Sequence, residues 1–311
     1  MTKLSTWIAC ALVSFAGAGC DTGSTPVTPP KEVAAAQPAI VTEGKRVVAG
    51  NTAAAEYLRV LVPPARVALV PEQVASYSAF RFDQEGWDSV GRLARYSADP
   101  ILAAGADLVV VHPWQEAETA VLLRDAGVPV LQLSTANGWD DIASNLRMLG
   151  TVLKCEKAVE KELLRRGDVV QRLAHEAGKR PKLRALVYSN DGTGGVAAGK
   201  RTTADAVLRM TGIVNAAAEA GLEGHAPIDF DRLLTIDPDL FVLAAPKSPA
   251  ETVAARAVLE STALLAGMRA VKEQRFVLLP DALLSSDSPT MVDAADLLAT
   301  RVDDLLAGRK Q

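Results

Sequence analysis

The sequence contains little of what several classes of protein depend on. Aromatic residues make up only 5% of the chain, there are three cysteines, and the 33 Lys and Arg residues are outnumbered by 37 Asp and Glu residues. Few aromatic side chains argue against a surface that stacks single-stranded nucleic acid, and the absence of a basic excess argues against binding of a nucleic-acid backbone. Three cysteines are too few for a disulfide scaffold. We therefore expect no nucleic-acid partner.

Motifs of common enzyme classes are also missing. The chain has neither the Gly-x-Gly-x-x-Gly fingerprint of dinucleotide binding nor the Gly-x-Ser-x-Gly elbow of many hydrolases. Gly194, Gly199 and Lys200 nearly form a phosphate-binding loop, but Arg201 stands where Ser or Thr would hold magnesium. With three histidines in total, a metal site of several His side chains is not expected. We predict a protein that is not an enzyme and has no metal site of its own.

What is present fits an α/β protein of two domains. The 311 residues are 49% hydrophobic, and roughly 150 residues make one domain. Short apolar runs, typical of buried parallel strands, alternate with helical patterns. The runs cover residues 45–49, 107–111, 128–133, 183–188, 240–243 and 275–279, and the clearest helices cover residues 115–126 and 202–210. This alternation predicts parallel sheets covered by helices.

The N-terminus has the proportions of a signal peptide. Lys3 precedes an apolar run over residues 7–15, small residues fill positions 16–19, and Cys20 follows. The run is too short to span a membrane permanently. Small residues directly before a cysteine resemble a lipobox, so we predict a signal peptide over residues 1–19 and lipid attachment at Cys20. Ordinary cleavage after Ala18 is the alternative.

A tether and a lone cysteine follow from this processing. Residues 20–43 are rich in Thr, Pro and Ala without helical or strand periodicity, which is typical of a disordered tether. Removal of the signal peptide discards Cys10, and lipid consumes Cys20. Cys155 then has no partner for an intrachain disulfide, and its helical surroundings favour the role of a small buried hydrophobic residue.

The two halves of the folded chain carry a repeat. Residues 99–110 match residues 231–242, each with an acidic residue, two helical turns, and an Asp-Leu pair that opens a buried strand. Between the halves, residues 139–180 are dominated by helix formers, and a helix of about 35–40 residues there would be about 55 Å long. Gly150 and Gly167 are places where it can break or kink. We predict an α/β fold of two related lobes with parallel-type sheets, over residues 44–138 and 181–311, joined by one long helix over residues 139–180.

This layout resembles the substrate-binding proteins of ABC importers for cobalamin, haem and iron-siderophores, the class with a rigid helical connection. The resemblance covers residues 45–306 and rests on the repeat and on the segments 198–210, 212–217 and 226–239. It implies a monomeric solute-binding receptor outside the cytoplasm, anchored to the membrane by lipid, with a small-molecule ligand and the importer's transmembrane subunits as partners. An exported α/β hydrolase and a purely structural lipoprotein are the alternatives.

The resemblance also implies docking residues. In the family one carboxylate on each lobe binds an arginine of each transmembrane subunit, and the matching positions here are Asp99 and Asp231. The family usually has Glu there, so both lobes carry a shorter acid. The alternative role of both residues is to favour the dipole of a helix in its first turn.

The ligand of such proteins lies between the lobes, at loops that follow strands. The side chains of His112 and His225 can coordinate the metal of a haem or corrinoid, or bind its carboxylates, while Trp114 and Tyr96 can form apolar walls. For all four, packing is the alternative. The predicted ligand-binding residues are Asn51, Thr52, Tyr96, His112, Trp114, Gly194, His225 and Ser286.

Overall fold

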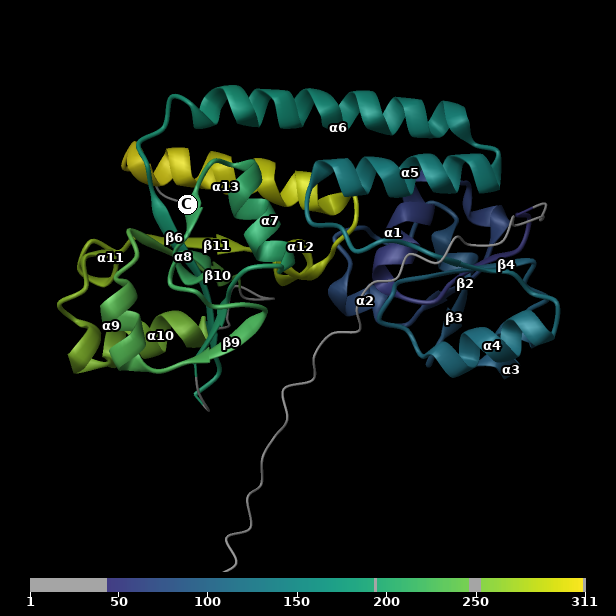
Figure 1. The fold of residues 1–311 in the computed structure, drawn as a ribbon, viewed down its shortest axis with the longest axis horizontal. Coiled ribbons are helices and arrows are strands. Elements are labelled where there is room, and N and C mark those ends of the chain that lie inside the picture. The colour runs from purple at the N-terminus through teal and green to yellow at the C-terminus, as the bar shows by residue number, and fades with distance from the viewer. Residues whose placement is uncertain (1–43, 193–194, 246–252, 310–311) are drawn as a thin grey trace, which may run out of the picture. The chain divides into compact units, whose positions relative to one another are not determined.

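The computed structural model describes residues 44–192, 195–245 and 253–309. The predicted signal peptide and tether, Cys20 and Gly194 lie outside the described residues. The expected α/β fold with two lobes is confirmed, because the chain forms one five-stranded and one six-stranded sheet, each covered by helices (Figure 1). Within the described ranges no helix is both long enough and apolar enough to cross a membrane.

The N-terminal lobe is built on a parallel sheet with the strand order β3-β2-β1-β4-β5. Its strands are short and apolar, and every residue of β4 is buried, as expected for strands covered on both faces. The elements are β1 (Val47–Ala49), α1 (Thr52–Leu61), the 3₁₀ turn η1 (Pro64–Arg66), β2 (Val67–Pro71), α2 (Val74–Tyr77), η2 (Trp87–Ser89), β3 (Gly91–Leu93), α3 (Ala98–Ala103), β4 (Leu108–Val111), α4 (Ala117–Asp125) and β5 (Val130–Gln132).

The C-terminal lobe has a mixed sheet with the order β11-β10-β6-β7-β9, and β8 pairs with β6. Its elements are β6 (Arg184–Asn190), β7 (Gly195–Ala198), α7 (Thr203–Met210), β8 (Val214–Asn215), α8 (Ala216–Glu219), β9 (His225–Ile228), α9 (Phe230–Ile236), β10 (Leu240–Ala244), α10 (Ala254–Ser261), η3 (Ala263–Leu265), α11 (Arg269–Lys272), β11 (Phe276–Leu279), α12 (Asp281–Ser285) and α13 (Thr290–Leu306).

Two strands of the C-terminal sheet, β7 and β9, depart from the parallel pairing predicted for the sheets. β7 is antiparallel to β6, and β9 is antiparallel to β7. Only residues 191–194 separate β6 from β7. A parallel connection requires a crossover of a dozen or more residues, so a link this short forces a hairpin.

The connection between the lobes is a pair of helices where one continuous helix was expected. α5 (Trp139–Leu153) and α6 (Glu156–Ala177) lie side by side and are joined by Lys154 and Cys155 (Figure 1). Lys154 takes a left-handed conformation, φ 53°, which turns the chain back. Gly150 does not break α5, and its missing side chain leaves room for Val159, because a Cβ there would lie 2.6 Å from a Val159 methyl carbon.

Although α5 and α6 carry the chain from one lobe to the other, the helices that hold the two lobes together are α6 and α13. The 22 residues of α6 span about 33 Å, and this helix contacts α1 of the N-terminal lobe as well as α7 and α13 of the C-terminal lobe. One hydrophobic cluster runs through α1, α5, α6, α7 and α13 and includes strand residues of both sheets. The outer face of each sheet has a separate cluster. Since the shared cluster belongs to both lobes, they are packed as one body on this side.

The repeat has a structural counterpart at the strand that opens each lobe. The carboxylate of Asp107 accepts from the backbone N–H groups of Lys45 (2.8 Å) and Arg46 (3.1 Å), and that of Asp239 accepts from the backbone N–H of Arg184 (2.8 Å). The Arg46 side chain donates to the carbonyl of Ala104 at the end of α3, and the Arg184 side chain donates to carbonyls at the end of α9, so each arginine binds the helix that precedes the aspartate. Each aspartate thus aligns a strand with its neighbour in the same way.

Candidate functional site

The two lobes meet at residues 286–288, the link between α12 and α13. Ser286 and Ser288 donate their hydroxyls to Oε2 of Glu56 in α1, the latter at 2.5 Å, and the Thr290 hydroxyl lies 3.3 Å from the same oxygen. Glu56 is completely buried. Because a buried carboxylate is costly unless it is hydrogen-bonded, these contacts fix the link against the N-terminal lobe.

The other carboxylate oxygen of Glu56 is held within its own lobe. Oε1 accepts from the Ser78 hydroxyl at 2.7 Å and from the backbone N–H of Ala79 at 3.1 Å. Glu56 also stands near the start of α13, a helix of 17 residues whose N-terminal dipole favours an anion. Glu56 therefore connects α1, α2 and α13 at one point.

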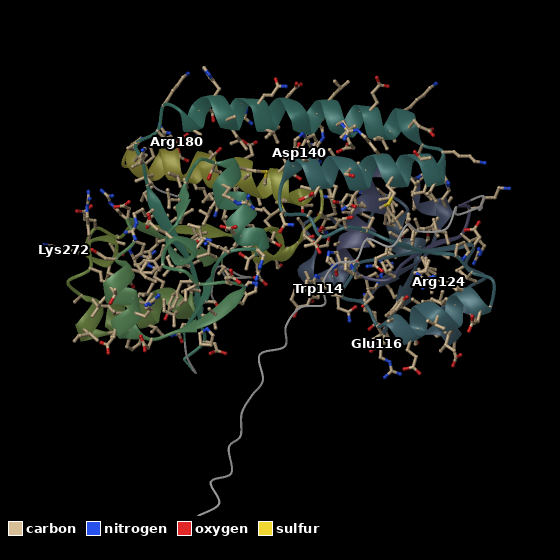
Figure 2. All side chains as sticks on the ribbon, in the orientation of Figure 1. Trp114, Glu116, Arg124, Asp140, Arg180 and Lys272 are labelled. Carbon is tan, nitrogen blue, oxygen red and sulfur yellow. The ribbon has the colours of Figure 1, made fainter. Side chains whose placement is uncertain are left out.

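His112 forms a second contact between the lobes. It follows β4, is 6% exposed, and its Nε2 lies within ion-pair distance of the Asp287 carboxylate, although the N–H is not directed along a hydrogen bond. The rings of His112 and Trp114 lie nearly parallel, 18° apart, with centroids 6.3 Å apart. Trp114 is 64% exposed, and Figure 2 shows it on the side of its lobe that is turned toward the other. The structure thus brings His112, Trp114 and Ser286 into one region.

Asn51 and Thr52 lie at the start of α1, where the chain leaves β1. The Asn51 side chain accepts from the backbone N–H of Ala54 at 2.8 Å and so caps the helix. Both residues are partly exposed. A cap of this kind explains the Asn on structural grounds, and a ligand contact of either residue stays a prediction.

Tyr96 lies against the same edge of the N-terminal sheet. Its ring packs on Gly50, where a Cβ would lie 3.1 Å from a ring carbon, and the residue is only 9% exposed. The hydroxyl is buried without a hydrogen-bond partner. Burial raises the pKa of Tyr96 to about 12, so the phenol is neutral near pH 7. An unpaired buried hydroxyl is unusual and is available to a ligand that can reach it.

The remaining predicted residues lie apart from this region. His225 is exposed at the start of β9, where it pairs with Ala198, while the other end of β9 lies beside the carboxyl end of β6. Asp99 and Asp231 are exposed in the first turns of α3 and α9. The side chain that caps α9 is Asp229. Asp231 is therefore not the capping residue, but its place in the first turn of α9, like that of Asp99 in α3, fits the dipole role as well as docking, and contact with an importer stays a prediction.

A pocket on the C-terminal lobe includes Gly192 and Gly195, which flank the predicted ligand-binding position Gly194 in the sequence. It has a volume of about 560 Å³ and lies at the carboxyl end of β6. This is the same end of the sheet at which β11 leads toward residues 286–288, because β6, β10 and β11 are parallel. Its lining is mostly apolar and consists of Asn190, Gly192, Gly195, Pro227, Ile228, Asp229, Phe230 and Val258. This lining suits one side of a mainly apolar ligand.

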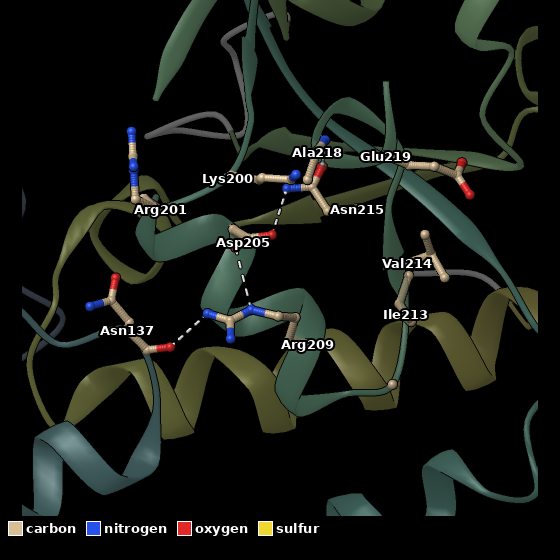
Figure 3. Close-up of a pocket in the computed structure, with 11 residues that line it drawn as sticks. Asn137, Lys200, Arg201, Asp205, Arg209, Ile213, Val214, Asn215, Ala218 and Glu219 are labelled. Atoms are coloured by element: carbon tan, nitrogen blue, oxygen red, sulfur yellow. Dashed lines mark hydrogen bonds and ion pairs between the residues drawn. The ribbon is translucent and has the colours of Figure 1, made fainter. Parts of the chain in front are cut away.

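A second pocket, of about 820 Å³, lies beside α7, β8 and α8 (Figure 3). Its central acid, Asp205, accepts from the Asn215 amide at 3.0 Å and forms an ion pair with Arg209 at 3.3 Å. Arg209 also donates to the carbonyl of Asn137 at 2.7 Å. Since these polar groups satisfy one another, we interpret them as a structural network that ties α7 to the segment before α5.

Glu56 was not predicted, although the sequence carries a signal for it. It is the single acid within the otherwise mainly apolar helix α1, and a charge on a buried helical face requires partners. Within residues 44–192, 195–245 and 253–309, no cluster of three or more His, Cys, Asp and Glu side chains is arranged to hold a metal ion.

The sequence matches one family model, described as periplasmic binding protein, over residues 89–283. This match covers more than half of the 311 residues. No curated protein sequence matches the chain.

Solved structures with the same fold come from several bacteria. A periplasmic haem-binding protein of Pseudomonas aeruginosa is 26% identical with a TM-score of 0.67, covering 83% of this chain and 92% of that one. The periplasmic haem-binding protein RhuT of Roseiflexus sp. RS-1, in apo form, is 22% identical with a TM-score of 0.71, covering 84% and 98%. HutB of Vibrio cholerae, also a periplasmic haem-binding protein, is 16% identical with a TM-score of 0.71, covering 83% and 99%.

Proposed function

Because the chain belongs to the periplasmic binding protein family, which supplies ABC importers with solute-binding proteins and not with enzymes, we propose that it delivers a flat metal chelate to such an importer. Haem is the chelate that we propose ahead of the others. Membership of this family argues against the two alternatives, an exported hydrolase and a structural lipoprotein. It also implies that the protein works in the periplasm or elsewhere outside the cytoplasm.

The observation that carries the proposal is the exposed Trp114 beside the buried His112. An indole 64% exposed at the end of β4 offers an aromatic face on the side turned toward the other lobe. Ligand sites favour aromatic surface with a few placed polar groups, and a porphyrin is a large flat aromatic ligand. The other lobe has a mostly apolar pocket at the carboxyl end of β6, the end of its sheet at which β11 leads toward residues 286–288. The haem-binding descriptions of the structural relatives support haem over cobalamin and ferric siderophores.

Titration with three probes tests the ligand class. Haemin, cyanocobalamin and ferrichrome are each added to the protein lacking residues 1–43, with tryptophan fluorescence and absorbance as readouts. We expect saturable haemin binding that Trp114→Ala weakens about tenfold, since base- or ring-stacking on an aromatic side chain contributes about 1–3 kcal/mol. Leu164→Ala is the matched control, because Leu164 is equally exposed but lies on α6.

Two outcomes contradict the proposal. Saturable binding of cyanocobalamin or ferrichrome without haemin binding would show that the ligand is not haem. Equal haemin affinities of the Trp114→Ala and Leu164→Ala variants place the ligand away from Trp114.

The lipid anchor is a separate part of the proposal. Small residues before Cys20 and the Thr- and Pro-rich segment after it support lipidation at that cysteine. Expression of the full chain with Cys20→Ala should move the protein from the membrane fraction to the soluble periplasmic fraction. Mass spectrometry of the mature N-terminus separates the two processing routes, because cleavage after Ala18 leaves an unmodified Gly19 as the first residue.

A further inference from the structure

The residues that follow α12 alternate between two N-terminal-lobe partners. Ser286 and Ser288 donate to the buried Glu56, and the residue between them, Asp287, faces His112. Because both neighbours are anchored on the same carboxylate, the backbone of Asp287 has little freedom, and its side chain is directed to the imidazole. The geometry of one short link therefore determines where a negative charge meets His112.

The two contacts differ in what can reach them. Glu56 is completely buried and has hydrogen-bond partners at both oxygens, so it serves as a fixed anchor. The Asp287 side chain is 18% exposed, and His112 is followed two residues later by the exposed Trp114. A ligand on Trp114 lies next to the His112–Asp287 contact, whereas the hydrogen bonds of Glu56 are sealed from it.

We propose that Asp287 of the C-terminal lobe is a positioning residue for ligand binding: it holds the His112 imidazole parallel to Trp114 and so couples the ligand surface of one lobe to the link between α12 and α13 of the other. The proposal rests on the function proposed above, because it places the ligand on Trp114. Asp287 does not touch the ligand in this role. It acts through the ring of His112, whose Nε2 lies within ion-pair distance of its carboxylate.

The first experiment needs no ligand. The chain has three histidines, and His175 and His225 are exposed, so they serve as internal controls in NMR spectra of the imidazole rings. Asp287→Asn, which keeps the shape of the side chain and removes its charge, should shift the ring signals of His112 and leave the other two in place. Unchanged His112 signals in a folded variant overturn the proposal, whether or not haemin is the ligand.

The second experiment is a double-mutant cycle with haemin as the probe. Asp287→Asn should weaken haemin binding by about threefold to tenfold, as expected when a side chain at a binding surface loses its fixed orientation. In a His112→Asn background the same substitution should have no effect, because the residue through which Asp287 acts is gone. Asp281→Asn is the matched control: it removes the same charge from exposed residue 281 at the start of α12.

The outcomes separate this proposal from the proposed function. An equal loss of haemin affinity in both backgrounds overturns the positioning role while leaving haemin as the ligand. Failure of the wild-type protein to bind haemin overturns the proposed ligand, and the NMR comparison then decides alone whether Asp287 positions His112. Asp287→Ser serves as a second variant if Asp287→Asn does not fold, with the thermal unfolding curve as the check.

Discussion

Glu56 and Ser288 are 232 positions apart in the chain and are joined by a hydrogen bond of 2.5 Å. The carboxylate belongs to the first helix of the N-terminal lobe and the hydroxyl to the last turn before the final helix of the C-terminal lobe. Both residues are completely buried. The first and last helices of the two lobes are thus joined at this point. The lobes are connected by a charged hydrogen-bond network as well as by the apolar packing around α6.

Removal of the Glu56 carboxylate should destabilise the protein strongly. Glu56→Ala removes the acceptor of the buried Ser286 and Ser288 hydroxyls, and we expect a loss of about 3 kcal/mol in the free energy of unfolding, as is typical when a buried polar network is broken. Glu56→Gln keeps one acceptor oxygen and the side-chain volume, so about half of that loss is expected. Urea unfolding followed by circular dichroism measures both values.

Glu160→Ala is the control for this series. Glu160 is an exposed acid on α6, and its removal should change the stability by less than about 0.5 kcal/mol. If Glu56→Ala is no more destabilising than Glu160→Ala, the network does not hold the lobes together.

Two neighbouring arginines on α6 should differ sharply when replaced. Arg166 is 0% exposed and bonds Glu162 at 3.1 Å and Asp293 of α13 at 2.7 Å, whereas the Arg165 side chain is 49% exposed. Arg166→Ala removes the buried cation that Glu162 and Asp293 share and leaves Glu162 with the half-exposed Arg165 at 3.2 Å, so we expect a loss of about 3 kcal/mol. Arg165→Ala should cost less than about 1 kcal/mol, because exposed ion pairs contribute little.

The comparison is made by chemical denaturation of both variants under the same conditions. Equal losses would mean that burial of the Arg166 pair contributes nothing beyond an exposed pair. Higher salt should reduce the contribution of Arg165 more than that of Arg166, since screening acts mainly on exposed charges.

Elements with a strong apolar period could be predicted from the sequence. β4 and β10 are runs of buried apolar residues, and both were placed correctly, as was the repeat whose Asp107 and Asp239 align the first strand of each lobe. The turn at Lys154 was missed, because Lys carries no signal for a left-handed conformation and the helical pattern continues on both sides. The antiparallel β7 was missed because its few residues have no distinct period.

The candidate site was only partly predictable for a related reason. Trp114 and His112 follow an identifiable strand, so their place at the end of the N-terminal sheet follows from the pattern. The pairing of His112 with Asp287 depends on how two lobes pack, and no local pattern encodes a contact between residues so far apart. The same holds for Glu56, where the sequence shows an acid in an apolar helix but not its partners.

Replacement of Tyr96 should affect stability and ligand binding in opposite directions. Its hydroxyl is buried without a hydrogen-bond partner, so folding removes it from water without a compensating bond. Tyr96→Phe removes this hydroxyl and should stabilise the folded protein by about 1 kcal/mol. A ligand that opens this region would give the hydroxyl its missing partner, so we expect Tyr96→Phe to lower haemin affinity by a factor of about 5. Denaturation and haemin titration of the same preparation measure the two effects, and a destabilised variant with unchanged affinity would contradict both.

The alkaline stability of Tyr96→Phe gives an independent check. The pKa of Tyr96 is raised by burial from 10.0 to about 12. Between these values the unfolded chain releases the phenolic proton while the folded chain retains it, so stability falls as the pH rises through this window and does not depend on this group below pH 10. In this pH window, the Tyr96→Phe variant should therefore lose less stability than the wild-type protein. Some of it should persist, because burial also raises the pKa of Tyr57 and Tyr188.

Charge reversal at the two lobes tests the predicted contact with the importer. Asp99 and Asp231 occupy equivalent places in the repeat, are exposed, and lie in the first turns of α3 and α9. A transporter with two equivalent subunits would present one cation to each, so Asp99→Lys and Asp231→Lys should each weaken the association about tenfold, and the double variant should abolish stimulation of the importer's ATPase in proteoliposomes.

The control for docking reverses two other exposed acids. Glu160→Lys with Asp168→Lys changes the net charge by the same amount on α6, far along the chain from α3 and α9. This variant should retain full stimulation at physiological salt, where charges beyond about 8 Å are largely screened. All variants should bind haemin with wild-type affinity, which separates docking from ligand binding. Full stimulation by the Asp99→Lys, Asp231→Lys double variant would show that the two acids do not contact the importer. If the control variant loses as much ATPase stimulation as the double variant, the loss is an effect of net charge and not of these two positions.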